Sequence, residues 1–325
     1  MRAAVCTEPG PARNLTLGQL PDPVPRSGQV LVEVRAAGVN YVDALFVEGR
    51  YQIKPPVPFV PGSEIAGTVT AVGPDTVGAP ALGTRVMASV GLGGFAEQVT
   101  VPVTSVVPLP DGLADTVAAT VAQSYATMRF ALTNRTTVRP DETVVVLGAS
   151  GGIGMAAIDV AHHAGAQVVA VASSDERLER CSDQGANVLI NSTTTDDLKS
   201  AIRDATNGGA DVIVDPVGGS ATDASLRALG TFGRLVVIGF ASGDIPALPA
   251  NQVLLRNRTV VGVDWGAWAM SNPTDNHALV TGIIADAASG MLSPQQPTEY
   301  PLAEVGTALA HLQQRVLAGK AVLVP

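Results

Sequence analysis

Short apolar runs separated by turn residues fill the N-terminal third of the chain. Four of them predict strands, at Val30–Val34, Ile65–Val72, Arg85–Val90 and Glu97–Val101. Prolines and glycines crowd the stretches between the runs, as in Pro55–Gly62. Short strands at regular spacing with Pro/Gly turns are typical of a small barrel or sandwich, so we predict a mainly β domain here.

The pattern changes after Asp111. Ala114–Leu132 has helical spacing, and beyond Thr143 apolar strands alternate with amphipathic helical stretches such as Asp175–Gln184 and Asp196–Thr206. The predicted strands are Val144–Leu147, Val168–Ala172, Val188–Ile190, Val212–Asp215, Leu235–Gly239 and Val260–Val263. Buried strands joined by crossovers predict a doubly wound parallel sheet, the Rossmann arrangement, and hence an α/β fold.

The chain leaves this sheet after Trp265. Asn276–Ser289 and Ala303–Ala318 have helical spacing, and Lys320–Val324 reads as a last strand. We therefore predict that a nucleotide-binding domain, residues 123–265, is inserted between two parts of a mainly β catalytic domain, residues 1–122 and 266–325.

Composition excludes several classes of partner. The formal net charge of -9 disfavours binding to nucleic acid or to an anionic membrane. The longest uncharged stretch, Thr143–Ile158, is shorter and far richer in glycine than a membrane span. The two cysteines, Cys6 and Cys181, lie far apart and fit buried thiols in a reducing compartment. Because Met1–Val5 leads into no apolar segment, we expect no signal peptide and a cytoplasmic location.

A glycine-rich turn is the strongest local signal. Gly148-Ala-Ser-Gly-Gly-Ile-Gly154 follows a predicted strand and opens a helix-like segment. Glycines at such a turn let the backbone approach a pyrophosphate, and the N–H groups of the first helical turn face its charge. This context predicts a dinucleotide site.

The end of the next strand bears on which dinucleotide binds. An NAD site places an acid there for the ribose 2′-OH, whereas this chain has Ala172 and Ser173. Ser173 and Ser174, with Arg177 nearby and Arg180 one turn further on, suit a 2′-phosphate, which predicts NADPH. Asp175 is expected to cap the following helix.

Motifs along essentially the whole chain carry a family resemblance. They are Ala37-Gly-Val-Asn40-Tyr-Val-Asp43, Pro61-Gly-Ser63-Glu64-Ile-Ala-Gly67, Gly94-Phe-Ala-Glu97, the glycine turn above, Asp215-Pro-Val-Gly-Gly219, Gly233-Arg-Leu-Val-Val-Ile-Gly-Phe240 and Asp264-Trp-Gly-Ala-Trp268. In this order they resemble the medium-chain dehydrogenase/reductase superfamily, in its zinc-free NADPH:quinone oxidoreductase (zeta-crystallin-like) branch. The resemblance implies a GroES-like β domain beside a Rossmann domain, an active site in the cleft between them, and a homodimer or homotetramer.

Zinc-dependent relatives differ at two positions. They carry Cys where this chain has Asn40 and His where it has Ser63, and they carry a cysteine-rich zinc lobe that is missing here. Two distant cysteines cannot form a Cys₄ site, and His162 and His163 are adjacent and so point to different faces of a helix. We expect no metal.

The resemblance also implies site residues. Asn40 and Tyr51 would act on the substrate carbonyl, whereas Asp43 and Glu64 lie at family positions near the cleft and suit structural hydrogen bonding equally well. The cofactor-binding residues implied by the resemblance and by the two strand ends are Thr127, Gly148, Ser150, Gly151, Gly152, Ile153, Ser173, Ser174, Arg177, Asn191, Val217, Gly239, Phe240, Trp265, Gly266 and Lys320. Two positions break the family pattern: Tyr41 replaces a proline, and Ser192 replaces a tyrosine that holds the adenosine phosphate.

Three functions remain open at this point. A quinone reductase, which would transfer hydride or single electrons from NADPH to the quinone, fits the motifs best, because quinones need no metal Lewis acid to be reduced. An alkenal, enone or enoyl-thioester double-bond reductase could use the same scaffold. An NADPH-binding structural or RNA-binding protein is the third, although the acidic charge disfavours RNA.

Overall fold

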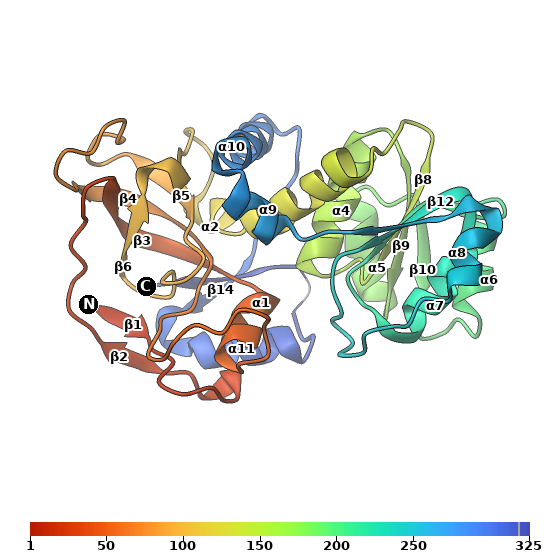
Figure 1. Ribbon diagram of the computed structural model, residues 1–325, viewed down its shortest axis with the longest axis horizontal. Helices are drawn as coiled ribbons and strands as arrows, with labels where there is room; N and C mark the ends of the chain where they lie inside the picture. The colour runs from red at the N-terminus through yellow and green to blue at the C-terminus, as the bar shows by residue number, and fades with distance from the viewer. Residues whose placement is uncertain (318) are drawn as a thin grey trace. The chain divides into compact units, whose positions relative to one another are not determined.

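The computed structural model describes residues 1–317 and 319–325, and the chain forms two compact units (Figure 1). Unit 1 comprises Met1–Gln123, Ser271–Gly290 and Pro294–Pro325, and unit 2 comprises Ser124–Met270 and Met291–Ser293. The chain thus enters unit 2 after the first β-rich stretch and returns to unit 1 for its last helices and strands.

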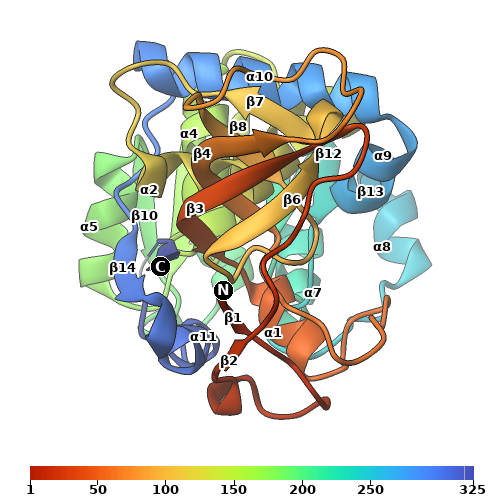
Figure 2. The same ribbon diagram turned by 90° about the vertical axis from the view of Figure 1, so that its left-hand side faces the viewer.

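Unit 1 is built on a mostly antiparallel sheet whose order is β14-β15-β3-β4-β5-β7, with β6 also pairing with β3. Its strands are β3 (Gln29–Val39), β4 (Glu64–Val72), β5 (Arg85–Ser89), β6 (Gln98–Pro102), β7 (Val106–Pro108), β14 (Thr298–Pro301) and β15 (Ala321–Val324), and a separate pair joins β1 (Arg2–Ala4) to β2 (Leu17–Gln19). The long β3 lies between β4 and β6 (Figure 2). Its last residues pair instead with β15, which brings the end of the chain to the end of β3.

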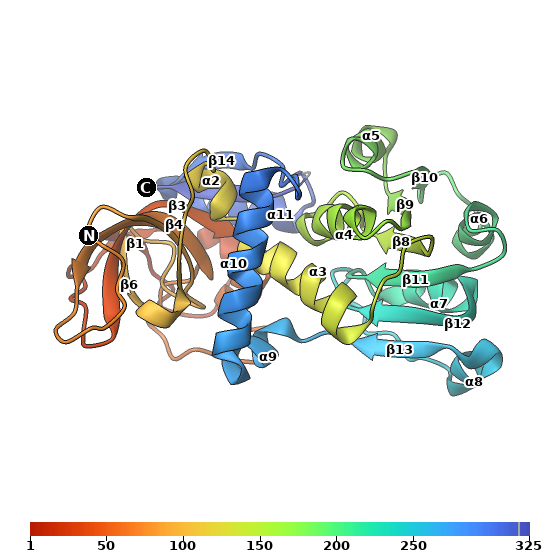
Figure 3. The same cartoon turned by 90° about the horizontal axis from the view of Figure 1, so that it is seen from above.

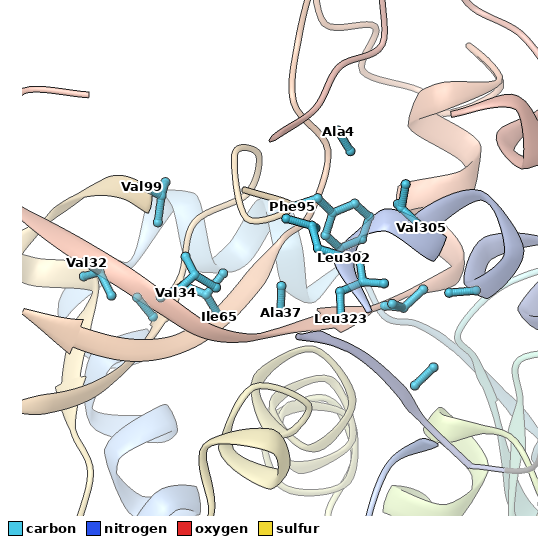
Figure 4. Close-up of a cluster of buried hydrophobic side chains, with 14 of the residues drawn as sticks. Ala4, Val32, Val34, Ala37, Ile65, Phe95, Val99, Leu302, Val305 and Leu323 are labelled. Carbon is cyan, nitrogen blue, oxygen red and sulfur yellow. The ribbon is translucent and has the colours of Figure 1, made fainter. Parts of the chain in front are cut away.

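Helices accompany the sheet of unit 1, and two of them, α1 and α11, contribute to its apolar core. They are α1 (Tyr41–Val47), α2 (Asp115–Ala118), α10 (Pro273–Ser289) and α11 (Val305–Gln313), with short 3-10 turns η1 (Ala12–Asn14), η2 (Val103–Ser105) and η6 (Leu302–Glu304). The core gathers alternate residues of β3 with Ile65, Phe95, Leu302 and Leu323 (Figure 4). Residues far apart in sequence therefore share one core.

In the described residues of unit 2, six parallel strands form one sheet in the order β10-β9-β8-β11-β12-β13 (Figure 3). They are β8 (Thr143–Leu147), β9 (Gln167–Ala172), β10 (Val188–Asn191), β11 (Ala210–Asp215), β12 (Leu229–Val237) and β13 (Thr259–Gly262). The central β8 and β11 are buried on both faces, which explains their continuous valine and isoleucine runs. The strand order reverses between β8 and β11, which confirms the predicted doubly wound sheet.

Helices precede, connect and follow the strands of unit 2. They are α3 (Thr127–Arg129), α4 (Gly152–His163), α5 (Asp175–Asp183), α6 (Leu198–Ala205), α7 (Gly219–Ala228), α8 (Ala250–Leu254) with the 3-10 turn η5 (Leu255–Asn257), and α9 (Trp265–Ser271). The predicted helix Ala114–Leu132 is interrupted, because α3 lies between two π-helical segments, η3 (Ala122–Ala126) and η4 (Phe130–Arg135).

Several boundaries differ from the predictions. Strand β12 begins at Leu229, six residues before its apolar run, because Leu229 already pairs with Ala210 of β11 ahead of a register shift that leaves Phe232 exposed. The last predicted helix ends at Gln313, and its expected final residue, Ala318, lies outside the described residues. Neither α1 nor α9 was predicted. Asn40 and Asp43 begin α1, where the Asn40 backbone N–H donates to Asp43 Oδ2 (2.8 Å), and Asp264 Oδ1 caps α9 by accepting from the Ala267 N–H (3.0 Å).

Candidate functional site

Three of the predicted site residues of unit 1 meet at the ends of three strands. Asn40 follows β3, Glu64 begins β4, and Gly38 pairs with Glu64 across the two strands. Lys320 immediately precedes β15, which pairs with the same end of β3. Antiparallel pairing therefore places an amide, a carboxylate and an ammonium together, although Lys320 is 280 residues from Asn40 in sequence.

Hydrogen bonds join these side chains into one buried network. Asn40 Nδ2 donates to Glu64 Oε1 (2.8 Å) and to Ser63 Oγ (3.3 Å). Lys320 Nζ donates to Asn40 Oδ1 and lies 2.9 Å from Glu64 Oε1. The other oxygen of Glu64 accepts from the Gln123 backbone N–H at 2.8 Å. Glu64 is 1% exposed, and its charge is compensated by a cation and by hydrogen bonds to both oxygens.

The network includes residues that the sequence analysis did not assign to the site. Ser63 was noted only as a departure from a metal ligand, and the backbone of Gln123 was not considered. Gly38 leaves room for the backbone at the end of α2 and for Glu64, because a Cβ there would lie 2.2 Å from the Ala119 carbonyl oxygen and 2.6 Å from Glu64 Oε1. Its place in the motif beside Asn40 was the only available signal.

Asp43 lies fully buried beside the network. Its Oδ2 accepts from the Asn40 N–H, whereas Oδ1 receives no hydrogen bond of ordinary geometry from the described residues. Burial raises the pKa of Asp43 to about 7, partly opposed by the Asn40 N–H and reinforced by the charge of Glu64. Asp43 is therefore a structural partner of the helix start that binds a proton near neutrality.

This raised pKa predicts a pH-dependent stability. The folded pKa of about 7 exceeds the ordinary value of 3.8, so Asp43 stabilises the fold at acid pH and loses that contribution as pH rises through 7. Between pH 5 and pH 8 the wild type should lose about 2 kcal/mol of unfolding free energy through this group, whereas Asp43→Asn should lose much less. Urea titrations at both pH values measure this. Asp204→Asn, at an exposed carboxylate, should keep the wild-type slope, and an unchanged slope in Asp43→Asn would contradict the prediction.

Tyr51 takes a separate place in unit 1. It follows Gly49, whose positive φ of 65° ends the turn after α1. The Tyr51 ring packs on Phe46 with centroids 4.7 Å apart and planes tilted by 59°. Its assignment to the substrate stays a prediction.

The glycine turn of unit 2 has the geometry of a phosphate cradle. It connects the carboxyl end of β8 to the start of α4, with Gly148 at φ 56°. No side chain caps α4, so its first N–H groups face outward from an uncapped helix start. A Cβ on Gly154 would lie 2.5 Å from the carbonyl oxygens of Gly148 and Ala149, so the tight turn requires glycine there. Gly148, Ser150, Gly151, Gly152 and Ile153 all lie in this turn and its helix start, which fits a dinucleotide pyrophosphate.

Arg177 reaches this turn from the neighbouring helix. Its Nη1 donates to Ser150 Oγ at 3.3 Å, so a guanidinium stands between the glycine turn and the end of β9. Ser174, not Asp175, caps α5 by accepting from the Arg177 N–H (3.4 Å), which corrects the predicted cap. Asp175 is instead the first helical residue, and its Oδ1 accepts from Asn191 Nδ2 at 2.7 Å. This contact joins the ends of β9 and β10.

The ends of β11 and β12 supply the remaining strand-end residues. Buried Asp215 accepts from the N–H groups of Val217 (2.8 Å) and Gly218 (2.9 Å) and from the Thr222 hydroxyl, which fixes the turn into α7. The backbone of Gly239 donates to the Asp215 carbonyl at 3.4 Å, so Val217 and Gly239 lie at one sheet edge. Phe240 follows them and is 38% exposed.

The last cofactor candidates lie on helices. Thr127 is buried on α3. Trp265 and Gly266 form the first turn of α9, where Trp265 is buried and Gly266 exposed, and Trp268 of the same helix stacks on Phe130 at 4.6 Å. Of all the predicted cofactor residues, Lys320 alone belongs to unit 1, in the network with Asn40 and Glu64.

Metal-ligating side chains do not gather into a site in the part of the chain that the structure describes. These residues hold no group of three or more His, Cys, Asp or Glu side chains that could bind a metal ion. Cys6 and Cys181 are buried and free, as predicted, and burial raises the pKa of Cys181 to about 11. Among the helices that the structure describes, none has both the length and the apolar character of a membrane span.

Family models match both units. The model described as an alcohol dehydrogenase GroES-like domain matches residues 26–111, and the one described as a zinc-binding dehydrogenase matches residues 152–280. The first match contains strands β3 to β7 of the unit 1 sheet, and the second contains strands β9 to β13 of the parallel sheet. They agree with the predicted GroES-like and Rossmann domains.

Three known proteins resemble the chain along nearly its whole length. Quinone oxidoreductase-like protein 2 of Bos taurus is 36% identical over 99% of this chain and 92% of that protein. The quinone oxidoreductase of Thermus thermophilus, solved also in complex with NADPH, is 31% identical with a TM-score of 0.86 and covers 100% of both chains. A mycocerosic acid synthase-like polyketide synthase of Mycobacterium tuberculosis is 31% identical over 99% of this chain but only 15% of its own length.

Proposed function

Because this chain belongs to the medium-chain dehydrogenase/reductase family, in its quinone oxidoreductase branch, we propose that it reduces quinones with NADPH and without zinc. It is an oxidoreductase of that family and binds NADPH. The quinone acceptor, the independence of zinc and the roles of single residues are the proposed part.

The proposal rests mainly on the hydrogen bonds of the Asn40 side chain. The family-model description implies zinc, and zinc-dependent relatives bind it through Cys and His at positions 40 and 63. Here Asn40 directs its Nδ2 donors at Ser63 and Glu64, while its oxygen accepts from the Lys320 ammonium. Zinc prefers thiolate, imidazole and carboxylate ligands, so an amide and a hydroxyl beside an ammonium do not fit it. The acceptor must then accept hydride without a metal Lewis acid.

Quinones meet this requirement because their conjugation spreads the charge that hydride addition creates. Bound NADPH supplies the hydride. The protein's part is to hold the cofactor and the acceptor in register and to stabilise charge on the acceptor oxygen. We assign the phosphates to the glycine turn, the nicotinamide end to Val217, Gly239 and Phe240, and the orientation of the acceptor to Tyr51.

Arg177 is proposed to bind the 2′-phosphate of NADPH, with Ser173 and Ser174 beside it. Arg177→Ala should raise the dissociation constant for NADPH roughly 10- to 100-fold, since a charge-assisted hydrogen bond is lost. The dissociation constant for NADH, which lacks the 2′-phosphate, should change less than about threefold. Titration of nicotinamide fluorescence with both cofactors measures this. Arg227→Ala on α7, which breaks an exposed ion pair with Asp223 (3.2 Å), is the control that should affect neither. Equal losses for both cofactors would refute the assignment.

The enzymatic proposal is tested by following the loss of reduced-nicotinamide absorbance with a polycyclic quinone. We expect rapid oxidation of NADPH, slower oxidation of NADH, and the same rates after treatment with a chelator. Activity that disappears with the chelator would refute zinc independence. Absence of quinone reduction would refute the assigned acceptor.

The polyketide synthase match favours a second acceptor class. A segment of that synthase resembles the whole of this chain, which supports reduction of an alkenal, enone or enoyl thioester as the alternative. Running the assay with an enone and an enoyl-CoA beside the quinone discriminates the two. A kcat/KM at least about tenfold higher for the conjugated double bond, a difference of roughly 1.4 kcal/mol in transition-state stabilisation, would make it the assigned activity.

We further propose a cytoplasmic homodimer or homotetramer that binds neither nucleic acid nor membranes. The negative charge of -9 supports the last two points. Within the described residues β13 pairs only with β12, which leaves an edge strand on the parallel sheet. Light scattering during size-exclusion chromatography tests the assembly, and a monomeric mass would refute it.

A further inference from the structure

The amide of Asn40 has no donor left for a ligand. A carboxamide carries two N–H donors and one carbonyl acceptor. In Asn40 the donors and the acceptor are all used within unit 1, since Nδ2 donates to Glu64 and Ser63 and Oδ1 accepts from Lys320. An acceptor oxygen that bound Asn40 would have to break one of these buried contacts.

Ser63, by contrast, retains a donor. Its Oγ accepts from Asn40 at 3.3 Å, and no described residue accepts the hydrogen of its hydroxyl. The residue is 8% exposed, less deeply buried than Glu64 beside it. Its backbone is held in place, because the Ser63 carbonyl accepts from the N–H groups of Val90 (2.9 Å) and Gly91 (3.2 Å). The network therefore ends at the Ser63 hydroxyl, which is held in place and whose hydrogen is accepted by no described residue.

The direction of the hydrogen bonds in the network makes the Ser63 hydroxyl a stronger donor. The Lys320 ammonium donates to Asn40 Oδ1, and Asn40 Nδ2 donates in turn to Ser63 Oγ. Each donation polarises the next group in such a chain, so positive charge at one end makes the hydroxyl at the other end a better donor. Glu64 balances the ammonium and keeps it in place, since Lys320 Nζ lies 2.9 Å from its Oε1.

We propose that Ser63 is a catalytic residue that donates a hydrogen bond to the acceptor oxygen on which negative charge develops. The role rests on the proposed quinone reductase function. The reduced nicotinamide supplies two electrons and one hydrogen as hydride, a C–H or O–H bond forms on the acceptor, and its oxygen becomes anionic. Water supplies the second proton, and Ser63 keeps its own. Asn40 and Lys320 are positioning residues that orient and polarise the hydroxyl.

Steady-state kinetics of Ser63→Ala and Ser63→Thr with the quinone test the role. Ser63→Ala should lower kcat and kcat/KM together by roughly 100-fold, as expected for a donor that acts on charge in the transition state. The dissociation constant for NADPH and the urea midpoint should stay at wild-type values. Ser63→Thr, which keeps a hydroxyl, should recover activity to within about threefold. Ser225→Ala removes a buried hydroxyl from α7 and should change none of these quantities.

The outcomes separate this role from the function on which it rests. An active wild type with an equally active Ser63→Ala variant overturns the role of Ser63 and leaves the quinone reductase intact. A threonine variant as slow as the alanine variant also overturns it, because the hydroxyl then is not what matters. A wild type that binds NADPH but reduces no quinone and no conjugated carbonyl overturns the proposed function and this role together.

Discussion

Replacing Lys320 by methionine is expected to lower the free energy of unfolding by about 3 kcal/mol or more, because it leaves a buried carboxylate without its cation. Glu64 is 1% exposed, and the Lys320 side chain is 13% exposed. The substitution also removes the donor to Asn40 Oδ1. Equilibrium urea unfolding of the NADPH-free protein measures the loss, since the bound cofactor would itself add stability.

Two further variants isolate the cause. Combining Glu64→Gln with Lys320→Met removes both charges and should recover a large part of the stability, so the two substitutions should be strongly non-additive. Arg50→Met breaks the exposed pair with Glu48, in which the arginine side chain is 59% exposed, and should cost less than about 0.5 kcal/mol. A Lys320→Met protein as stable as the Arg50→Met protein would contradict the buried ion pair. The affinity of Lys320→Met for NADPH also tests the prediction that Lys320 reaches the cofactor phosphates.

Alanine at Gly154 is expected to damage both the fold of the glycine turn and its affinity for NADPH. The new Cβ would lie 2.5 Å from the backbone oxygens of Gly148 and Ala149, closer than a Cβ can approach, so the turn must move. We expect a loss of about 2 kcal/mol in unfolding free energy. NADPH affinity should fall at least about tenfold, since the N–H groups of the first turn of α4 lose their arrangement.

Gly151 separates these two effects. A Cβ there would lie 3.4 Å from the Gly148 oxygen, an ordinary contact, and its φ of -81° suits alanine. Gly151→Ala should therefore keep the unfolding free energy within about 0.5 kcal/mol and still weaken NADPH binding, because only the ligand needs the space. Gly262→Ala, where nothing lies within 4 Å, should leave both quantities unchanged. If Gly154→Ala and Gly262→Ala behaved alike, the close approach in the turn would be refuted.

Local signals account for the predictions that the structure confirms. The parallel sheet followed from continuous apolar runs alternating with amphipathic segments, because both faces of its central strands are buried. The glycine turn followed from its position between a strand and a helix. Helix starts were less well predicted, since Ser174 competes with Asp175 for the cap of α5 and either residue suits it locally. The caps of α1 and α9 had signals in Asn40, Asp43 and Asp264 that an analysis of apolar spacing does not use.

The residue pattern was thus sufficient to establish the two kinds of sheet, the glycine turn and its dinucleotide, because these depend on periodicity and on the conformations open to neighbouring residues. It also singled out Asn40, Asp43, Glu64 and Lys320, but only as separate positions in motifs. Only the folded chain shows that Lys320 pairs with Glu64, that the donors and the acceptor of the Asn40 amide all have partners, and that the Ser63 hydroxyl keeps a donor for a ligand. The two Lys320 contacts link the start of β15 to the neighbouring ends of β3 and β4 across 256 residues or more, and hydrogen-bond direction and burial exist only once the strands have paired.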